Sequence, residues 1–199
     1  MQITGMLWGR KLLDLVEFTH SEVHGPELSV DEIKDMIKRH GQLFIKPMFK
    51  GGVGKKGKSG LLGRVDNISD ALKEKERLYF CEHVDGFNKV KSDGVTYEGA
   101  VPADYEVYFS ITESTEHRSP VMTVTHHGGV DIEELDSDKL AVVPFDPLTG
   151  LKAFHVSNAL MDLGAPPQVI SPLVQNLPKL WDLYNNYGCL LYTSDAADE

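Results

Sequence analysis

The sequence predicts an α+β fold, in which helices and a group of strands occupy separate stretches of the chain. Three observations support this class. A helical pattern of apolar residues covers residues 29–40, three strand patterns follow one another between residues 95 and 125, and helical patterns return from about residue 157 onward. Such segregation of helices and strands along a sequence is typical of α+β proteins.

The first helix is expected at residues 29–40. Ser29 and Glu32 have the spacing of a capping box, in which each side chain accepts a hydrogen bond from the other residue's backbone N–H. Gly41 follows as a C-terminal stop. The apolar residues that recur on one face of this segment are Val30, Ile33, Met36 and Ile37.

A strand is expected next, at residues 43–49, and Pro47 places this strand near a sheet edge or a strand end. Residues 69–79 are rich in Lys and Glu and predict a second helix with Ser69 as its N-cap. Between this strand and this helix lies a basic, glycine-rich segment.

Strand patterns fill the middle of the chain. Residues 95–101, 106–112 and 121–125 are enriched in β-branched and aromatic side chains. Turns are expected at residues 92–94, which read Ser-Asp-Gly, and at residues 116–120. These three segments are therefore expected to be strands joined by turns.

Two helices are expected toward the end of the chain, at about residues 157–163 and 172–187. The second has Ser171 as a predicted N-cap and Pro172 at the first helical position. Pro178 is expected to kink this helix or to split it in two, because proline removes a helical hydrogen bond.

Composition limits the classes of function. The chain has 199 residues, of which 41% are hydrophobic, and a formal net charge of −10. This length allows one sizeable core or two small subdomains. No apolar run reaches the length of about 18 residues that a membrane span needs, and Cys81 and Cys189 show no metal-ligand spacing. We therefore expect a cytoplasmic protein without membrane or nucleic-acid partners, since its net charge repels phosphate backbones.

The basic segment at residues 43–65 stands out against this acidic background. It contains six Lys or Arg residues, is rich in glycine, and contains no Asp or Glu. Lysine side chains and the backbone N–H groups of glycine-rich loops commonly hold phosphate. The segment therefore predicts a site for a small phosphorylated ligand.

Two architectures of this segment are open. Residues 52–59 match the P-loop pattern G-x-x-x-x-G-K-[ST], which indicates a P-loop nucleotidase. That pattern needs a helix from Lys58 onward, whereas Gly60 and Gly63 each cost a helix about 1 kcal/mol. The interpretation that we favour is a hairpin with a long glycine-rich loop that folds over a nucleotide.

Further motifs follow in a distinctive order. Lys46 precedes the Lys-Gly-Lys segment at residues 56–58, residues 124–135 read VTHHGGVDIEEL, and residues 145–151 read FDPLTGL. Together these motifs resemble the ATP-grasp subunit or domain of the succinyl-CoA ligase β and ATP-citrate lyase family, the ADP-forming carboxylate–CoA ligases.

This resemblance implies an ATP-grasp domain over residues 1–188, in which two subdomains clasp the nucleotide. Residues 1–92 would form the subdomain with the glycine-rich loop, and residues 93–188 would contain the hinge and second-subdomain elements. The C-terminal part of the fold is expected to be missing, and residues 189–199 are expected to be a non-native tail.

The resemblance also implies the nucleotide site. Glu98 and Glu106 would flank the linker that receives adenine and ribose, where a carboxylate accepts bonds from ribose hydroxyls and backbone groups pair with the base edge. The residues expected to bind ATP are Lys46, Lys56, Gly57, Lys58, Glu98, Val101 and Glu106.

No catalytic residue is assigned. The phosphohistidine of the resembled family lies in another subunit or domain, so we expect His126 and His127 to be structural. Asp131, Glu133 and Glu134 are equally compatible with a cleft and with a solvated turn.

The implied activity is ATP-dependent activation of a di- or tricarboxylate for thioester formation with CoA, through an acyl phosphate. ATP and Mg²⁺ are the implied cofactors, with the Asn and Asp ligands of the metal expected beyond this chain. The implied partner is a CoA-binding, phosphohistidine-bearing subunit or domain in a hetero-oligomer. The sequence does not distinguish citrate, succinate and malate. The alternatives are the P-loop nucleotidase and a non-catalytic fragment that retains the fold.

Overall fold

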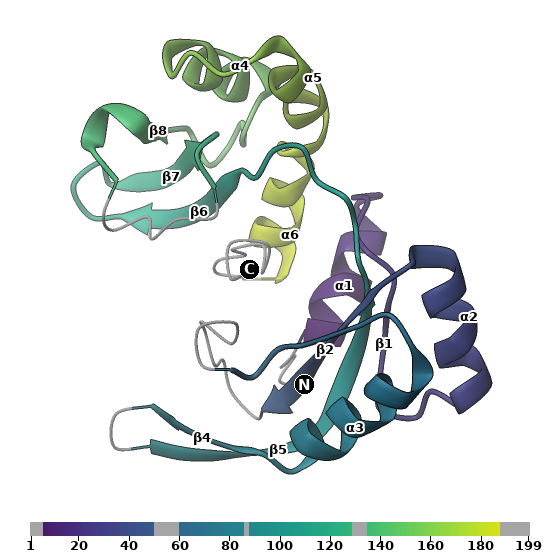
Figure 1. Ribbon diagram of the computed structural model, residues 1–199. Coiled ribbons are helices and arrows are strands. Elements are labelled where there is room, and N and C mark those ends of the chain that lie inside the picture. Colours follow the sequence, from purple (N-terminus) through teal and green to yellow (C-terminus); the bar gives the residue numbers. More distant parts are fainter. Residues whose placement is uncertain (1–5, 50–59, 86–87, 129–134, 188–199) are drawn as a thin grey trace. The chain divides into compact units, whose positions relative to one another are not determined.

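The computed structural model describes residues 6–49, 60–85, 88–128 and 135–187. The chain forms two compact units (Figure 1). The first unit comprises Met1–Asp14 and Thr19–Pro102, and the second comprises Leu15–Phe18 and Ala103–Glu199. The subdomain boundary expected from the sequence, at about residue 92, stays a prediction about the ATP-grasp subdomains.

The first unit packs helices against an antiparallel sheet. The strand order of the sheet is β1-β5-β2-β3, with β4 paired to β5. Its elements are α1 (Met6–Leu15), β1 (Val23–His24), α2 (Val30–His40), β2 (Leu43–Phe49), β3 (Gly63–Val65), α3 (Ile68–Tyr79), β4 (Glu82–Asp85) and β5 (Asn88–Gly99).

One face of this sheet forms the core of the first unit. Leu43 and Ile45 of β2 share that face with Tyr97 of β5, since Ile45 and Tyr97 are directly opposed across the pair. All three side chains are fully buried. They pack in one cluster with residues of α2 and α3, namely Ile33, Met36, Ala71 and Leu78.

The hairpin interpretation of the basic segment is confirmed at its two ends. β2 and β3 are antiparallel, with Leu43 opposite Val65 and Ile45 opposite Gly63. Pro47 lies past the end of this pairing, opposite Val95 of β5. Gly60 is in a turn with a φ of 70°, and β3 begins at Gly63. These residues exclude the helix from Lys58 onward that a P-loop requires.

The helix expected at residues 29–40 is confirmed, together with its capping box and its Gly41 terminus. The second helix starts earlier than expected. The N-cap of α3 is Asn67, whose side chain accepts a hydrogen bond from the backbone N–H of Asp70 at 2.9 Å. Ser69 therefore lies inside the helix and is not its cap.

The turn expected at residues 92–94 is a bulge within β5. Pro47 pairs with Val95 and Phe49 pairs with Ser92, so β5 contains one residue more than β2 across this interval. The Ser92 hydroxyl donates to the Gly94 carbonyl at 2.7 Å. A bulge uses the same small and polar residues as a turn, and this explains why the sequence predicted a turn at these positions.

The second unit packs a three-stranded antiparallel sheet against three helices. The strand order is β6-β7-β8. The elements are β6 (Tyr108–Ser114), β7 (Ser119–Thr125), a 3₁₀ turn η2 (Ser137–Lys139), β8 (Ala141–Pro144), α4 (Ala153–Asp162), α5 (Pro167–Asn176) and α6 (Lys179–Tyr187). Its core joins residues from both layers, including Ile111, Met122, Val156, Leu160 and Trp181.

Pro178 separates α5 from α6, as expected. The start of the predicted helix was wrong, because α5 begins at Pro167 rather than at Pro172. Proline is favoured in the first turn, where its missing N–H has no helical partner, and both positions satisfy that sequence rule. Pro172 instead lies inside α5, and Ser171 is not a cap.

In the described ranges, no helix is long and apolar enough to cross a membrane.

Candidate functional site

A buried cluster of charges lies in the first unit. Lys46 of β2 is 5% exposed and Glu98 of β5 is 4% exposed. The Lys46 Nζ lies 3.4 Å from Glu98 Oε2. A third charge comes from α1, where Arg10 Nη2 lies 3.9 Å from the same carboxylate oxygen.

The register of β2 and β5 explains why Lys46 and Glu98 meet. Phe44 is opposite Glu98 and Lys46 is opposite Thr96. Opposed residues share a face of the sheet, and a long side chain reaches its diagonal neighbour on that face. Lys46, Thr96 and Glu98 therefore lie on the face opposite to Ile45 and Tyr97 of the core.

The cluster has unused hydrogen-bonding capacity. In the described part of the chain, Arg10 Nε and Glu98 Oε1 are buried without a hydrogen-bond partner. A buried polar atom left unsatisfied costs about 1–3 kcal/mol. Two cations around one carboxylate also leave one formal positive charge among these three side chains. The arrangement suits a ligand that brings an anion and a hydrogen-bond donor.

The segment that leads out of the first unit is held next to Glu98. Gly99 donates its N–H to the Glu22 carbonyl at 2.9 Å, and Ala100 donates to the Gln42 carbonyl at 3.0 Å. Val101, predicted to contact the base, is 61% exposed and still belongs to the first unit. Backbone groups near Val101 are thus positioned by two fixed neighbours.

Glu106, the second predicted glutamate, belongs to the second unit. Its carbonyl accepts a hydrogen bond from Gly128 N–H at 3.0 Å. A Cβ added to Gly128 would lie 2.6 Å from the Glu106 carbonyl carbon. Glycine at position 128 therefore lets the His-His-Gly segment approach the strand entrance at Glu106.

The rings of the two histidines of that segment contact each other at a tilt of 37°. The ring centroids of His126 and His127 are 4.1 Å apart. Burial lowers the pKa of His126, and the neighbouring His127 lowers that pKa further. His126 Nδ1 is buried with no hydrogen-bond partner in the described residues. The structural role expected for His126 and His127 stays a prediction.

Several predicted residues lie outside the described part of the chain. Lys56, Gly57 and Lys58 are among them, as are Asp131, Glu133 and Glu134. Within the described ranges, no group of three or more His, Cys, Asp or Glu side chains is placed to hold a metal ion.

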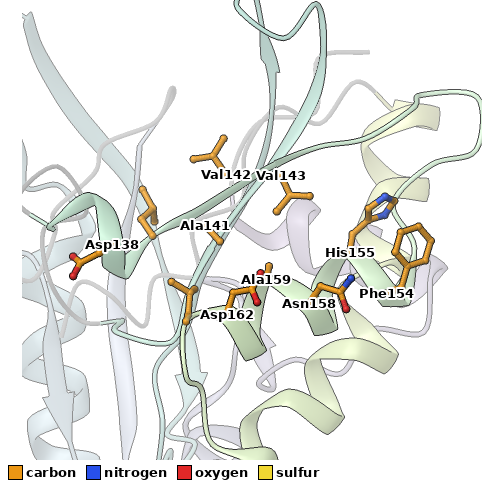
Figure 2. A pocket seen from close by; sticks show the side chains of 11 residues that line it. Asp138, Ala141, Val142, Val143, Phe154, His155, Asn158, Ala159 and Asp162 are labelled. Atoms are coloured by element: carbon orange, nitrogen blue, oxygen red, sulfur yellow. The ribbon is translucent and has the colours of Figure 1, made fainter.

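The second unit contains a separate pocket of about 420 Å³ between β8 and α4 (Figure 2). Phe154 and His155 lie toward one end, and Asp138 and Asp162 lie toward the other. Burial lowers the pKa of His155, and so does Lys152. None of the predicted site residues lines this pocket.

Arg10 is the member of the charged cluster that sequence reasoning missed. The helix that carries it was not predicted, and a single arginine on a helix is usually solvated. Only the tertiary contact with Glu98 distinguishes it.

An α+β chain of two units, with a β-hairpin around a glycine-rich segment and the motif order described above, belongs to the class of ATP-grasp proteins. A family model described as "ATP-grasp domain" matches residues 18–192, and this chain belongs to that family.

Curated relatives are β subunits of ADP-forming succinate–CoA ligase. The chain is 28% identical over 172 residues to that subunit of Desulfatibacillum aliphaticivorans, with 83% of this chain and 45% of the relative covered. It is 30% identical over 135 residues to the Halobacterium salinarum subunit, with 65% and 34% covered. The chain therefore spans less than half the length of these relatives.

Solved structures share the fold. ATP citrate lyase from Methanothrix soehngenii, in complex with citrate and coenzyme A, has a TM-score of 0.62 at 20% identity, with 89% of this chain and 40% of that chain covered. A dinucleotide-forming acetyl-coenzyme A synthetase from Ca. Korarchaeum cryptofilum has a TM-score of 0.62 at 11% identity, with 89% and 77% covered. The α+β ATP-grasp fold expected from the sequence is confirmed.

Proposed function

We propose that this chain is the ATP-binding part of an ADP-forming carboxylate–CoA ligase, of the succinate–CoA ligase or ATP citrate lyase type. The observation that supports this most is the buried Lys46–Glu98 pair next to the hairpin. Removing a lysine and a glutamate from water costs more than a loosely made ion pair returns, and buried titratable groups of this kind are concentrated at functional sites. The names of the curated relatives support the reaction class.

Each site residue has a proposed role that follows from its chemistry. Lys46 binds a phosphate as a point charge, and Glu98 Oε1 accepts a hydrogen bond from a ribose hydroxyl. Backbone groups at Val101 pair with the base edge, and Glu106 borders the nucleoside. The glycine-rich loop folds over the phosphates, with Lys56, Gly57 and Lys58 as contacts.

The proposed chemistry begins when a histidine nitrogen of the partner subunit or domain attacks the terminal phosphorus of ATP, and ADP leaves. A carboxylate oxygen of the substrate then attacks the phosphorus of this phosphohistidine, which frees the histidine and forms an acyl phosphate. The CoA thiol then attacks the acyl carbon, which releases phosphate and gives the thioester. Mg²⁺ would neutralise phosphate charge in such a transfer, but the described residues offer no cluster to hold it. The CoA-binding subunit or domain is the proposed partner.

The test is ATP binding to the 199-residue chain, measured by isothermal titration calorimetry. Lys46→Ala is expected to weaken binding at least about tenfold, which corresponds to about 1.4 kcal/mol. Lys73→Ala serves as the matched control, because the Lys73 side chain is 74% exposed in α3 and should not affect binding.

Removing Lys46 leaves Glu98 buried beside Arg10 alone, so Lys46→Ala also threatens the fold. The double variant Lys46→Met/Glu98→Gln has no buried carboxylate and is therefore measured as well. If this variant folds and binds ATP as tightly as the unmodified chain, the proposed role of Lys46 is overturned.

A further inference from the structure

We propose that Arg10 is a positioning residue. Its guanidinium group pairs with the Glu98 carboxylate when the Lys46 ammonium moves to a phosphate of the nucleotide. This inference rests on the proposed function, because it concerns how the same site exchanges partners when ATP binds. The resulting ligand-bound arrangement would be an Arg10–Glu98 pair, with Lys46 on the phosphate.

The distances indicate a loosely held carboxylate. Charge-assisted N–H···O bonds are usually about 2.7–2.9 Å long. The two cation contacts of Glu98 Oε2 are longer, at 3.4 Å to Lys46 Nζ and 3.9 Å to Arg10 Nη2. Neither cation therefore makes a tight hydrogen bond to this oxygen, and the carboxylate is shared between them.

The unsatisfied atoms show what a tighter arrangement would use. Arg10 Nε and Glu98 Oε1 are both buried without a hydrogen-bond partner in the described residues. Guanidinium and carboxylate groups commonly pair through two parallel hydrogen bonds. If Arg10 approached by about 1 Å, its Nε and Nη2 could meet both oxygens of Glu98 in that geometry. The same movement would give both buried atoms a partner, and Glu98 Oε1 would keep a second lone pair for the ribose hydroxyl.

The movement of Arg10 would lower the free-energy cost of separating Lys46 from the buried Glu98 carboxylate. A buried carboxylate that loses its only partner is strongly destabilising, because its charge is left uncompensated away from water. If Lys46 were the sole partner of Glu98, that cost would oppose its engagement of a phosphate. Arg10 is a second cation next to Glu98, so its approach would remove most of the penalty when Lys46 engages a phosphate.

Helix α1 is suited to hold Arg10 in place. Leu12 and Leu13 of the same helix are buried, at 8% and 7% exposed. The Arg10 side chain itself is 17% exposed. Burial of the neighbouring leucines fixes the helix, whereas the arginine retains enough freedom to shift its guanidinium group.

The experiment uses inorganic tripolyphosphate alongside ATP, because tripolyphosphate reports on Lys46 without any ribose contact. Calorimetry compares the unmodified chain with Arg10→Met, Glu98→Gln and the double variant. We expect Arg10→Met to weaken tripolyphosphate binding about tenfold in the unmodified background. In the Glu98→Gln background, where no carboxylate needs compensation, the same change should have less than about a twofold effect. Lys11→Met, at the exposed neighbouring position of α1, is the control.

Other outcomes overturn the inference. An equal loss in both backgrounds would mean that Arg10 contacts the phosphate directly or serves only the fold. If Arg10→Met lowers the tripolyphosphate affinity in neither background, Lys46 binds phosphate without any contribution from Arg10. Thermal unfolding of every variant separates an effect on binding from an effect on folding. Arg10→Lys is a further variant, which keeps the positive charge but cannot form two parallel hydrogen bonds. Arg10→Lys should bind tripolyphosphate with an affinity between those of the unmodified chain and Arg10→Met.

The failure of this inference is distinguishable from failure of the proposed function. If the unmodified chain binds neither ATP nor tripolyphosphate, the nucleotide site itself is refuted, and the exchange with it. If the unmodified chain binds both and Arg10→Met binds equally well, only the role of Arg10 is refuted.

Discussion

At the scale of single residues, the first unit places very different side chains on the two faces of one sheet. Ile45 and Tyr97 are fully buried against helices, whereas Lys46, Thr96 and Glu98 are buried on the other face. Charged side chains inside a protein break the ordinary rule for cores, and such violations are expected at functional sites. This contrast makes the polar face, rather than the pocket between β8 and α4 of the second unit, the candidate for ligand binding.

Glu22 provides a prediction about pH. Arg39 hydrogen-bonds its carboxylate, His40 and His24 do the same, and together they lower its pKa from 4.5 to about 2 in spite of partial burial. A carboxyl whose folded pKa lies below its unfolded value stabilises the fold above the unfolded value. This contribution should be fully present above about pH 4.5 and be lost as the pH falls toward 2.

The measurement is the urea midpoint of the unmodified chain and of Glu22→Gln, at pH 6 and at pH 3. The difference between the two proteins should be smaller at pH 3. A difference that stays constant across this interval would show that the Glu22 charge is not linked to folding.

Gly150 provides a prediction about packing. Its φ is 74°, and an added Cβ would lie 2.5 Å from Cδ1 and Nε1 of Trp181, a buried core residue. Gly150→Ala should therefore cost about 2–5 kcal/mol, from backbone strain together with overpacking. Gly164 has a φ of 70° and no atom within 4 Å of an added Cβ, so Gly164→Ala should cost only the strain, about 1–2 kcal/mol. Equal losses in chemical denaturation would contradict the clash with Trp181.

Residues of the candidate site could be predicted only where they belong to a recognisable sequence motif. Lys46 and Glu98 were expected from the order of motifs, and the structure brings their side chains together. Arg10 was not expected, since no local pattern distinguishes a helical arginine that meets a buried carboxylate from a solvated one. The strand register and the position of α1 supply that information, and both depend on tertiary packing.

At the scale of elements, strong local signals were reliable and ambiguous ones were not. The capping box at Ser29 and the interruption at Pro178 both appear as expected. Residues 92–94 were misread because a bulge and a turn favour the same residues. Pro172 was misread because Pro167 satisfies the same rule for a helix start five residues earlier.

The start of α3 yields a prediction that separates two adjacent candidates for the N-cap. The Asn67 side chain accepts from the Asp70 N–H at 2.9 Å, whereas Ser69 lies within the helix. Asn67→Ala should lower the free energy of unfolding by about 1 kcal/mol. Ser69→Ala should change it by less than about 0.5 kcal/mol, since Ala favours helix interiors. A larger loss for Ser69→Ala would contradict the observed cap.

At the scale of the whole molecule, the described residues form two separate hydrophobic cores. One cluster includes Ile45 and Tyr97 of the first unit, and the other includes Leu160 and Trp181 of the second. Each core joins a sheet to helices from its own unit. Cooperative opening of a protein usually follows such packed clusters, so each unit is expected to open around its own core.

A matched pair of core truncations tests this expectation. Ile45 and Leu160 are both fully buried, and truncation of either to Ala should cost about 2–5 kcal/mol. Amide hydrogen exchange followed by mass spectrometry is the readout. Ile45→Ala should speed exchange in peptides of β2 and β5 and leave β6 and β7 protected, whereas Leu160→Ala should do the reverse. Loss of protection in both units from either change would mean that the two cores unfold as one cooperative structure, in which case the division into units would be geometric and not energetic.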